Sequence, residues 1–153
     1  MFKSLLRLIS TFFYVGYFPL IPGTAGSLAG VFIFLLVKNN TFAHILTLGG
    51  LLALGFFVCG RAERLMQKKD PSCIVIDEVC GMLLSLLFLP YDIKLVVVAF
   101  VIFRILDTLK PYPVGKLERL KGSLGIMSDD IVAGLYTNIM LQVAVISRVL
   151  SAS

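Results

Sequence analysis

Long uncharged stretches alternate with short charged segments along the chain, and this alternation predicts helices. In the first stretch Pro19 and Pro22 interrupt helical structure, so we expect a helix over residues 27–37 and the residues leading into them. An asparagine pair at residues 39–40 predicts a turn, and residues 41–60 form the return helix of a hairpin. The uncharged stretches cover residues 8–37, 39–60, 79–91, 95–103 and 131–147.

A second hairpin follows, although its uncharged stretches are short. Crossing about 30 Å of hydrocarbon takes roughly 20 helical residues, so each stretch must extend into its charged flanks. We therefore expect helices over residues 74–89 and 94–109, with the turn at residues 90–92.

The two ends of the chain complete the predicted fold. The last helix is expected to begin near Asp129, after a loop at residues 122–125. An N-cap role for Ser128 or Asp129 is the structural alternative to metal binding by the adjacent pair Asp129 and Asp130. Residues 1–10 predict an amphipathic helix at the membrane surface. The expected fold is one all-α domain over residues 1–153, a compact helical membrane bundle with an N-terminal interfacial helix, two helical hairpins and a C-terminal transmembrane helix.

Composition supports a membrane protein, because 58% of the residues are hydrophobic and only 15% are charged. The net charge of +5 indicates attraction to anionic lipid headgroups, since the basic residues flank apolar spans and form no patch suited to nucleic acid. Their distribution predicts that the acidic face lies in the cytoplasm, although the short hairpins could dip into the bilayer without crossing it. Three cysteines without a CxxC pair favour a reduced setting over zinc binding or disulfides.

Five of the nine acidic residues lie in three short clusters beside apolar runs. In the second hairpin Asp77 lies 14 residues before Tyr91 and Asp107 lies 16 after it, so both are about 20 Å from the turn. Carboxylates beside hydrocarbon persist when a base, a metal or a proton pathway pairs with them. Salt bridges and helix capping are the structural alternatives. The five residues are Asp77, Glu78, Asp107, Asp129 and Asp130.

Arg104, Asp107 and Lys110 recur at a spacing of three, which stacks them on one helix face. This pattern allows a salt-bridge ladder or a metal-binding carboxylate between two phosphate-binding cations. Carboxylates without nearby His or Cys ligands select Mg²⁺ first and Mn²⁺ second.

Small residues at positions 22–27, with Thr24 and Ser27 as hydroxyl donors, predict either a phosphate cradle or a membrane-edge turn capped by Ser27. His44, the only histidine, lies far from the acidic clusters in a long apolar helix, and we expect it to be a packing residue.

Together these stretches resemble the phosphatidylglycerophosphatase A family. The resemblance implies a Mg²⁺-dependent bacterial lipid phosphatase in the cytoplasmic (inner) membrane, multi-pass, with the five carboxylates as its acidic site. Two loops depart from the family pattern, at residues 16–19 and at Ser123, which replaces an expected glycine. The motifs are PLIPGTAGSLAG at residues 19–30, IVIDEVCGM at 74–82, VIFRILDTLKPYPV at 101–114 and GSLGIMSDDIVAG at 122–134.

The resemblance implies hydrolysis of phosphatidylglycerophosphate to phosphatidylglycerol. We expect Mg²⁺ to be held by Asp129, Asp130 and one or both of Asp77 and Asp107. Arg104 and Lys110 would balance the phosphate charge, and the nucleophile would be water. A carboxylate nucleophile and a second metal stay open. The competing hypotheses are a phosphatase for another lipid or a soluble ester, and a small membrane protein with a cation pathway.

Overall fold

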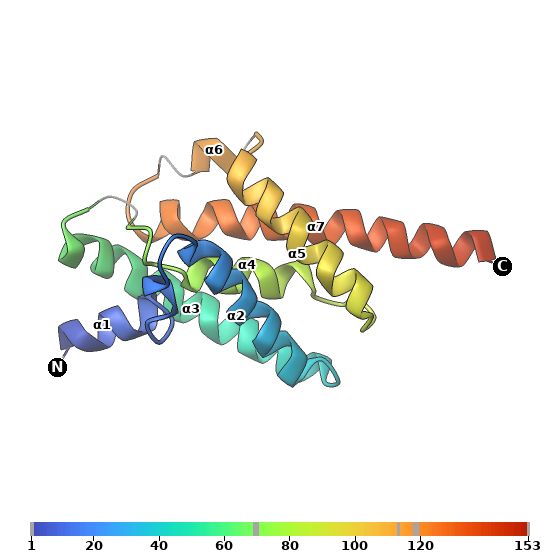
Figure 1. The fold of residues 1–153 in the computed structure, drawn as a ribbon, viewed down its shortest axis with the longest axis horizontal. Coiled ribbons are helices and arrows are strands. Elements are labelled where there is room, and N and C mark those ends of the chain that lie inside the picture. The colour runs from blue at the N-terminus through green and yellow to red at the C-terminus, as the bar shows by residue number, and fades with distance from the viewer. Residues whose placement is uncertain (1, 69–70, 113, 118–119, 153) are drawn as a thin grey trace.

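The computed structural model describes residues 2–68, 71–112, 114–117 and 120–152, and these contain helices and no strand. The prediction of an all-α bundle is therefore confirmed. Figure 1 shows the long helix α7 running along the bundle, with the shorter helices gathered around its first half. The elements are α1 (Phe2–Ser10), the 3-10 turn η1 (Val15–Tyr17), α2 (Pro22–Val37), α3 (Thr41–Met66), α4 (Ile76–Ser85), α5 (Ile93–Leu109), α6 (Val114–Leu117) and α7 (Ser123–Ala152).

The first predicted hairpin is present as α2 and α3, with both helices longer than expected. Helix α2 begins at Pro22 because proline is well suited to the first turn, where its missing N–H leaves no hydrogen bond unmade. The Asn40 side chain caps α3 by accepting a hydrogen bond from the Ala43 N–H at 3.0 Å. Helix α3 then continues past Gly60 to Met66, so the charged residues that follow the apolar run are still helical.

The second hairpin and the last helix differ more from their predicted bounds. Helix α4 ends at Ser85, four residues before the expected end. Helix α7 begins at Ser123, so the prediction of a start near Asp129 is wrong, and Ser128 and Asp129 are not N-caps. Gly122 has a φ of +65°, a conformation that glycine adopts without strain, and the helix starts directly after it. The short helix α6 was not predicted.

Helix α4 occupies the centre of the bundle. It packs more extensively against α7 and α2 than against its hairpin partner α5. Ten residues are too few to cross a bilayer, and Val79, Met82 and Leu83 are fully buried within the protein. Within the described part of the chain, two helices are long and apolar enough to span a membrane, namely α3 and the part of α7 from Ser123 to Ser147.

Helices α4 and α7 approach each other closely at two glycines. A Cβ atom added to Gly134 would lie 2.4 Å from the carbonyl oxygen of Gly81, and one added to Gly81 would lie 2.7 Å from the carbonyl oxygen of Asp130. Small residues let helix backbones approach closely, and Gly81 and Gly134 allow this approach of α4 and α7.

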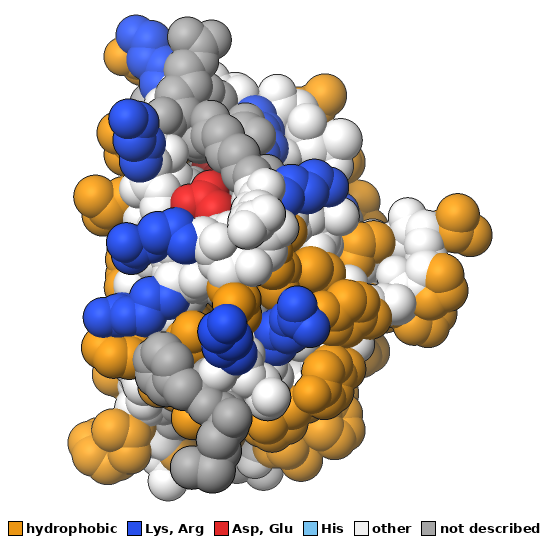
Figure 2. Space-filling model, turned by 90° about the vertical axis from the view of Figure 1, so that its left-hand side faces the viewer, with side chains coloured by type: hydrophobic (Ala, Val, Ile, Leu, Met, Phe, Trp, Pro, Cys, Tyr) orange, Lys and Arg blue, Asp and Glu red, His pale blue; other side chains and the backbone are white. Residues whose placement is uncertain are grey.

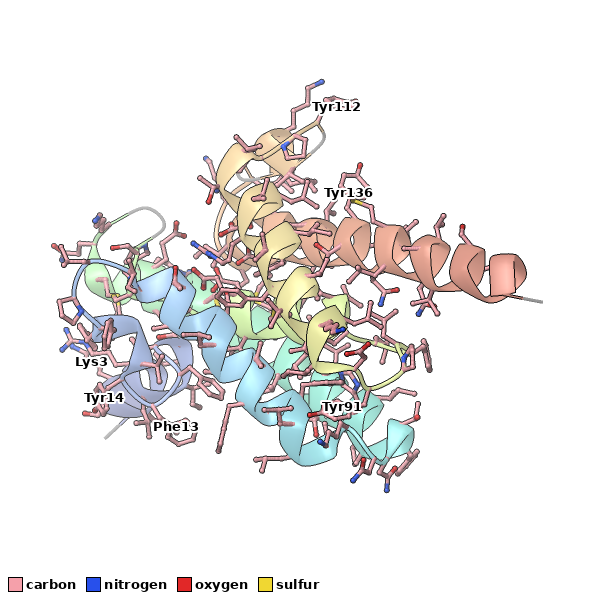
Figure 3. All side chains as sticks on the ribbon, turned by 45° about the vertical axis from the view of Figure 1, so that its right-hand side comes forward. Lys3, Phe13, Tyr14, Tyr91, Tyr112 and Tyr136 are labelled. Carbon is pink, nitrogen blue, oxygen red and sulfur yellow. The ribbon has the colours of Figure 1, made fainter. Side chains whose placement is uncertain are left out.

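The turns of the two hairpins meet at one end of the bundle. The Lys38 ammonium lies 3.4 Å from the centre of the Tyr91 ring, and the Phe34 and Tyr91 ring centres are 6.5 Å apart. Figure 3 shows Tyr91 far from Lys3, Phe13 and Tyr14, which lie around α1. Lys3, Phe13 and Tyr14 are exposed, which fits the expected interfacial helix, although its place at the membrane surface stays a prediction.

Candidate active site

Three carboxylates from α4 and α7 form a compact group inside the bundle. One oxygen from each of Asp77, Glu78 and Asp130 lies within 4.8 Å of the others. Asp77 and Asp130 are buried and Glu78 is partly exposed. We call these three residues the carboxylate group. Its geometry suits a single cation held by several oxygen atoms.

Helix packing brings these side chains together. Asp77 and Glu78 lie in the first turn of α4, where the helix dipole favours negative charge. Asp130 lies one turn before Gly134 on α7, and Gly81 lies one turn after Asp77 on α4. The contact between the two glycines therefore holds Asp130 against the start of α4.

The carboxylate group lacks protein partners for some of its buried oxygens. Among the described residues, Glu78 Oε2 and Asp130 Oδ1 are buried and accept no hydrogen bond. Burial raises the pKa of Glu78 to about 7. Burial, and then the neighbouring Glu78 charge, raise the pKa of Asp77 well above its usual value. Unpaired buried carboxylate oxygens are costly, and a bound cation removes that cost.

The other two acidic residues, Asp107 and Asp129, each form a salt bridge with a basic side chain at the rim of the group. Arg104 Nη1 donates to Asp107 Oδ2 at 2.6 Å, and Lys110 Nζ donates to Asp129 Oδ2 at 3.0 Å. The salt-bridge ladder is therefore correct for Arg104 and Asp107. It is wrong for Lys110, which follows the end of α5 in a left-handed conformation and reaches across to α7. Asp107 is close enough to Glu78 to interact with it electrostatically.

The start of α2 borders the same site. A Cβ added to Gly23 would lie 2.7 Å from Glu78 Oε1 and 3.2 Å from Arg104 Nη1. The predicted cradle is therefore the first turn of a helix, which also favours anions through its unpaired N–H groups. Thr24 lies in this turn and is partly exposed, whereas the buried Ser27 hydroxyl donates to the Gly23 carbonyl oxygen at 2.9 Å.

Sequence reasoning missed the part that glycines play in placing the site. Cβ atoms added to Gly26 and Gly30 of α2 would lie 2.8 Å from the side chains of Val75 and Met82. Small residues at helical spacing are the signal that could have predicted this contact. Together with Gly23, they let α2 lie directly against the start of α4.

Two expectations concern residues outside the site. His44 is buried, and its Nε2 lies 3.0 Å from the Leu83 carbonyl oxygen, consistent with a packing role. Cys59, Cys73 and Cys80 are not joined in disulfides, and the Cys59 thiol lies 3.8 Å from the Met127 sulfur.

Comparisons with known proteins connect this geometry to a family. The sequence model described as phosphatidylglycerophosphatase A matches residues 8–145. The Escherichia coli (strain K12) protein of that name is 38% identical over 134 residues, which cover 84% of this chain and 77% of the relative. The Haemophilus influenzae protein of that name is 31% identical over 140 residues, or 89% and 86% of the two chains. A Bacteroides thetaiotaomicron protein, provisionally named a phosphatidylinositol-3-phosphatase, is 37% identical over 145 residues, or 90% and 91%. No solved structure matches the chain.

Proposed function

Because this chain belongs to the phosphatidylglycerophosphatase A family, we propose that its carboxylate group is the catalytic centre of a phosphatidylglycerophosphate phosphatase. The protein is a phosphoric monoester hydrolase of phospholipid biosynthesis, and its substrate is a phospholipid. Hydrolysis adds water across the terminal phosphate ester and releases phosphatidylglycerol and inorganic phosphate.

The observation that carries this proposal is the pair of unpaired buried oxygens, Glu78 Oε2 and Asp130 Oδ1, within a group of three carboxylates. Among the described residues, the group that could hold an ion consists of carboxylates and includes no His or Cys, and such hard oxygen ligands favour Mg²⁺, with Mn²⁺ as the second choice. Asp77, Glu78 and Asp130 would hold the ion. When bound, the ion supplies positive charge that polarises the phosphate and stabilises the transition state.

The rim residues are proposed to position the phosphate. Asp107 and Asp129 anchor Arg104 and Lys110, so a guanidinium and an ammonium are held in place to stabilise the charge on phosphate oxygens. Asp107 and Asp129 hold these two basic side chains, and a role for either as a further metal ligand stays a prediction. The nucleophile is water.

The first turn of α2 would complete the phosphate site. Gly23 leaves room beside Glu78 and Arg104, and Thr24 offers a backbone N–H and a hydroxyl. Ser27 contributes through helix packing, because its hydroxyl is already used within α2.

The protein is membrane-associated, and we propose a multi-pass arrangement in the bacterial inner membrane with the site facing the cytoplasm. The two candidate spans found among the described residues, α3 and α7, support two crossings. Figure 2 shows Lys and Arg side chains around a small acidic area at the end of the bundle that lies at the left of Figure 1. A basic end on the cytoplasmic side agrees with the positive-inside rule.

A substrate panel scored by phosphate release tests the function. We expect the purified protein to hydrolyse phosphatidylglycerophosphate faster than phosphatidylinositol 3-phosphate or glycerol 3-phosphate. Preference for the inositol lipid would instead favour the activity named for the Bacteroides relative.

Metal removal tests the proposed ion. We expect EDTA to abolish turnover, and added Mg²⁺ to restore it more fully than Ca²⁺, because Ca²⁺ prefers more ligands at longer distances. Undiminished turnover in excess EDTA would contradict the metal assignment.

A further inference from the structure

A second, basic cleft lies between the C-terminal part of α3 and the start of α7. Its volume is about 860 Å³, which is in the range of small-molecule and cofactor sites. No member of the carboxylate group lines it. Gly60 and Ser123 are among the residues that line it, and the Gly60 N–H donates to the Ser123 hydroxyl oxygen at 2.7 Å. We call this feature the basic cleft.

The walls of the basic cleft are strongly cationic. Four basic side chains and one carboxylate, that of Glu63, line it. Arg64 Nε donates to the Gly60 carbonyl oxygen at 3.0 Å, which holds this guanidinium in place. The four basic residues are Arg61, Arg64, Lys68 and Lys121.

Apolar surface adjoins these charges. Phe56 and Phe57 line the basic cleft and are 38% and 55% exposed. The Arg61 guanidinium lies 3.9 Å from the centre of the Phe57 ring and also donates to the Phe57 carbonyl oxygen. The cleft therefore offers hydrogen-bond donors for an anion next to rings that suit a hydrocarbon chain.

We propose that the basic cleft binds one anionic glycerophospholipid, with its phosphate among the four cations and an acyl chain along Phe56 and Phe57. Basic pockets between membrane helices bind anionic lipid headgroups by this combination of charge and apolar contact. A soluble anion would use the cations and leave the two rings exposed. This lipid occupies a place separate from the substrate phosphate and does not depend on the catalytic assignment.

The absence of tryptophan from the chain permits a direct test. A Phe56→Trp variant in lipid nanodiscs places an indole in the basic cleft, where bromine atoms on acyl chains quench its fluorescence on contact. We expect brominated phosphatidylglycerol to quench more than brominated phosphatidylcholine at equal content. A Phe42→Trp variant is the matched control, because Phe42 lies at the other end of α3 and is 73% exposed. It should be quenched equally by both lipids.

Removing charge should remove the preference. Adding Arg64→Gln or Lys121→Gln to Phe56→Trp should lower the preference for the anionic lipid about fivefold each. Lys121 is exposed, so its substitution should leave folding intact, and retained phosphate release verifies this. Equal quenching by both lipids in Phe56→Trp, or an unchanged preference after charge removal, would overturn the proposal. Loss of the preference on adding glycerol 3-phosphate would also overturn it, by identifying a soluble ester as the occupant.

Discussion

The two ends of helix α4 bury polar groups in opposite ways. At the C-terminal end, Asn138 Nδ2 donates to the carbonyl oxygens of Ser85 and Leu87 at 3.1 and 2.7 Å, and Gln142 Nε2 donates to Leu87 at 3.2 Å. At the N-terminal end, oxygens of Glu78 and Asp130 are buried without a partner among the described residues. Helix α7 supplies side chains at both ends.

This difference distinguishes the buried polar groups that stabilise the fold from those that serve the function. The amides complete hydrogen bonds that a helix end inside the bundle would otherwise lack, so they stabilise the fold. The carboxylates repel one another, and their unpaired oxygens gain a partner only when a cation binds. Substitutions at one end should therefore change activity, and substitutions at the other should change stability.

The largest effect is expected for Asp130→Asn. It keeps the side-chain volume but removes one charged oxygen ligand, so phosphate release should fall by more than about 10³-fold, beyond the loss on removing a single preorganised donor. Thermal stability should stay the same or rise, because like-charge repulsion decreases. Near wild-type turnover at limiting Mg²⁺, in protein that is inserted and folded, would show that the carboxylate group is not the metal site.

The second-largest effect is expected for Arg104→Ala, which should lower kcat/KM by about 10²–10³-fold. The substitution removes the guanidinium that Asp107 holds at the rim. Arg104→Lys should recover only part of the activity, because an ammonium cannot donate two parallel hydrogen bonds to a phosphate. Steady-state kinetics on both variants would measure this order, and full activity in Arg104→Ala would exclude a phosphate contact.

Gly134→Ala should disturb the site without changing its chemistry. The added methyl group meets the Gly81 carbonyl oxygen at 2.4 Å, so α7 must move away from α4 and carry Asp130 with it. A displacement of about 1 Å can cost about 10²-fold in rate, and we expect a loss of that order or smaller. The control is Gly49→Ala, since a Cβ there has no neighbour within 4 Å. Activity measured for the two variants should differ clearly, and equal activity would argue against the glycine contact as the feature that places Asp130.

Local sequence patterns predicted much of this fold. The charged breaks between apolar runs placed both hairpins, and Asn40 marked the turn before α3 correctly. The hairpins and the Asn40 cap follow from hydrophobic patterning and capping, which are local properties. The acidic clusters in the sequence also contain the three carboxylates that the structure brings together.

Contacts between residues that are far apart in the sequence determine the features that the sequence alone did not predict. Helix α4 ends early where amides from α7, more than 50 residues away, accommodate its last carbonyls. Lys110 pairs with Asp129 because α5 ends at Leu109 and the chain turns toward α7, which spacing alone does not indicate. The grouping of Glu78 with Asp77 and Asp130 likewise depends on the Gly81–Gly134 contact.

The smallest effect on activity is expected at the amide end, for Asn138→Leu. Leucine has the branched shape of asparagine but donates no hydrogen bond, so the Ser85 carbonyl loses the Asn138 donor whereas the Leu87 carbonyl keeps the Gln142 donor. Leaving one buried carbonyl group unpaired costs about 1–3 kcal/mol, and thermal or denaturant unfolding should show a loss of this size or smaller. Asn138 lies eight residues after Asp130, about 12 Å along α7, so turnover of the folded variant should stay within about threefold of wild type. A large loss of turnover with unchanged stability would mean that the amide end takes part in catalysis, and the division of α4 into a structural and a functional end would be wrong.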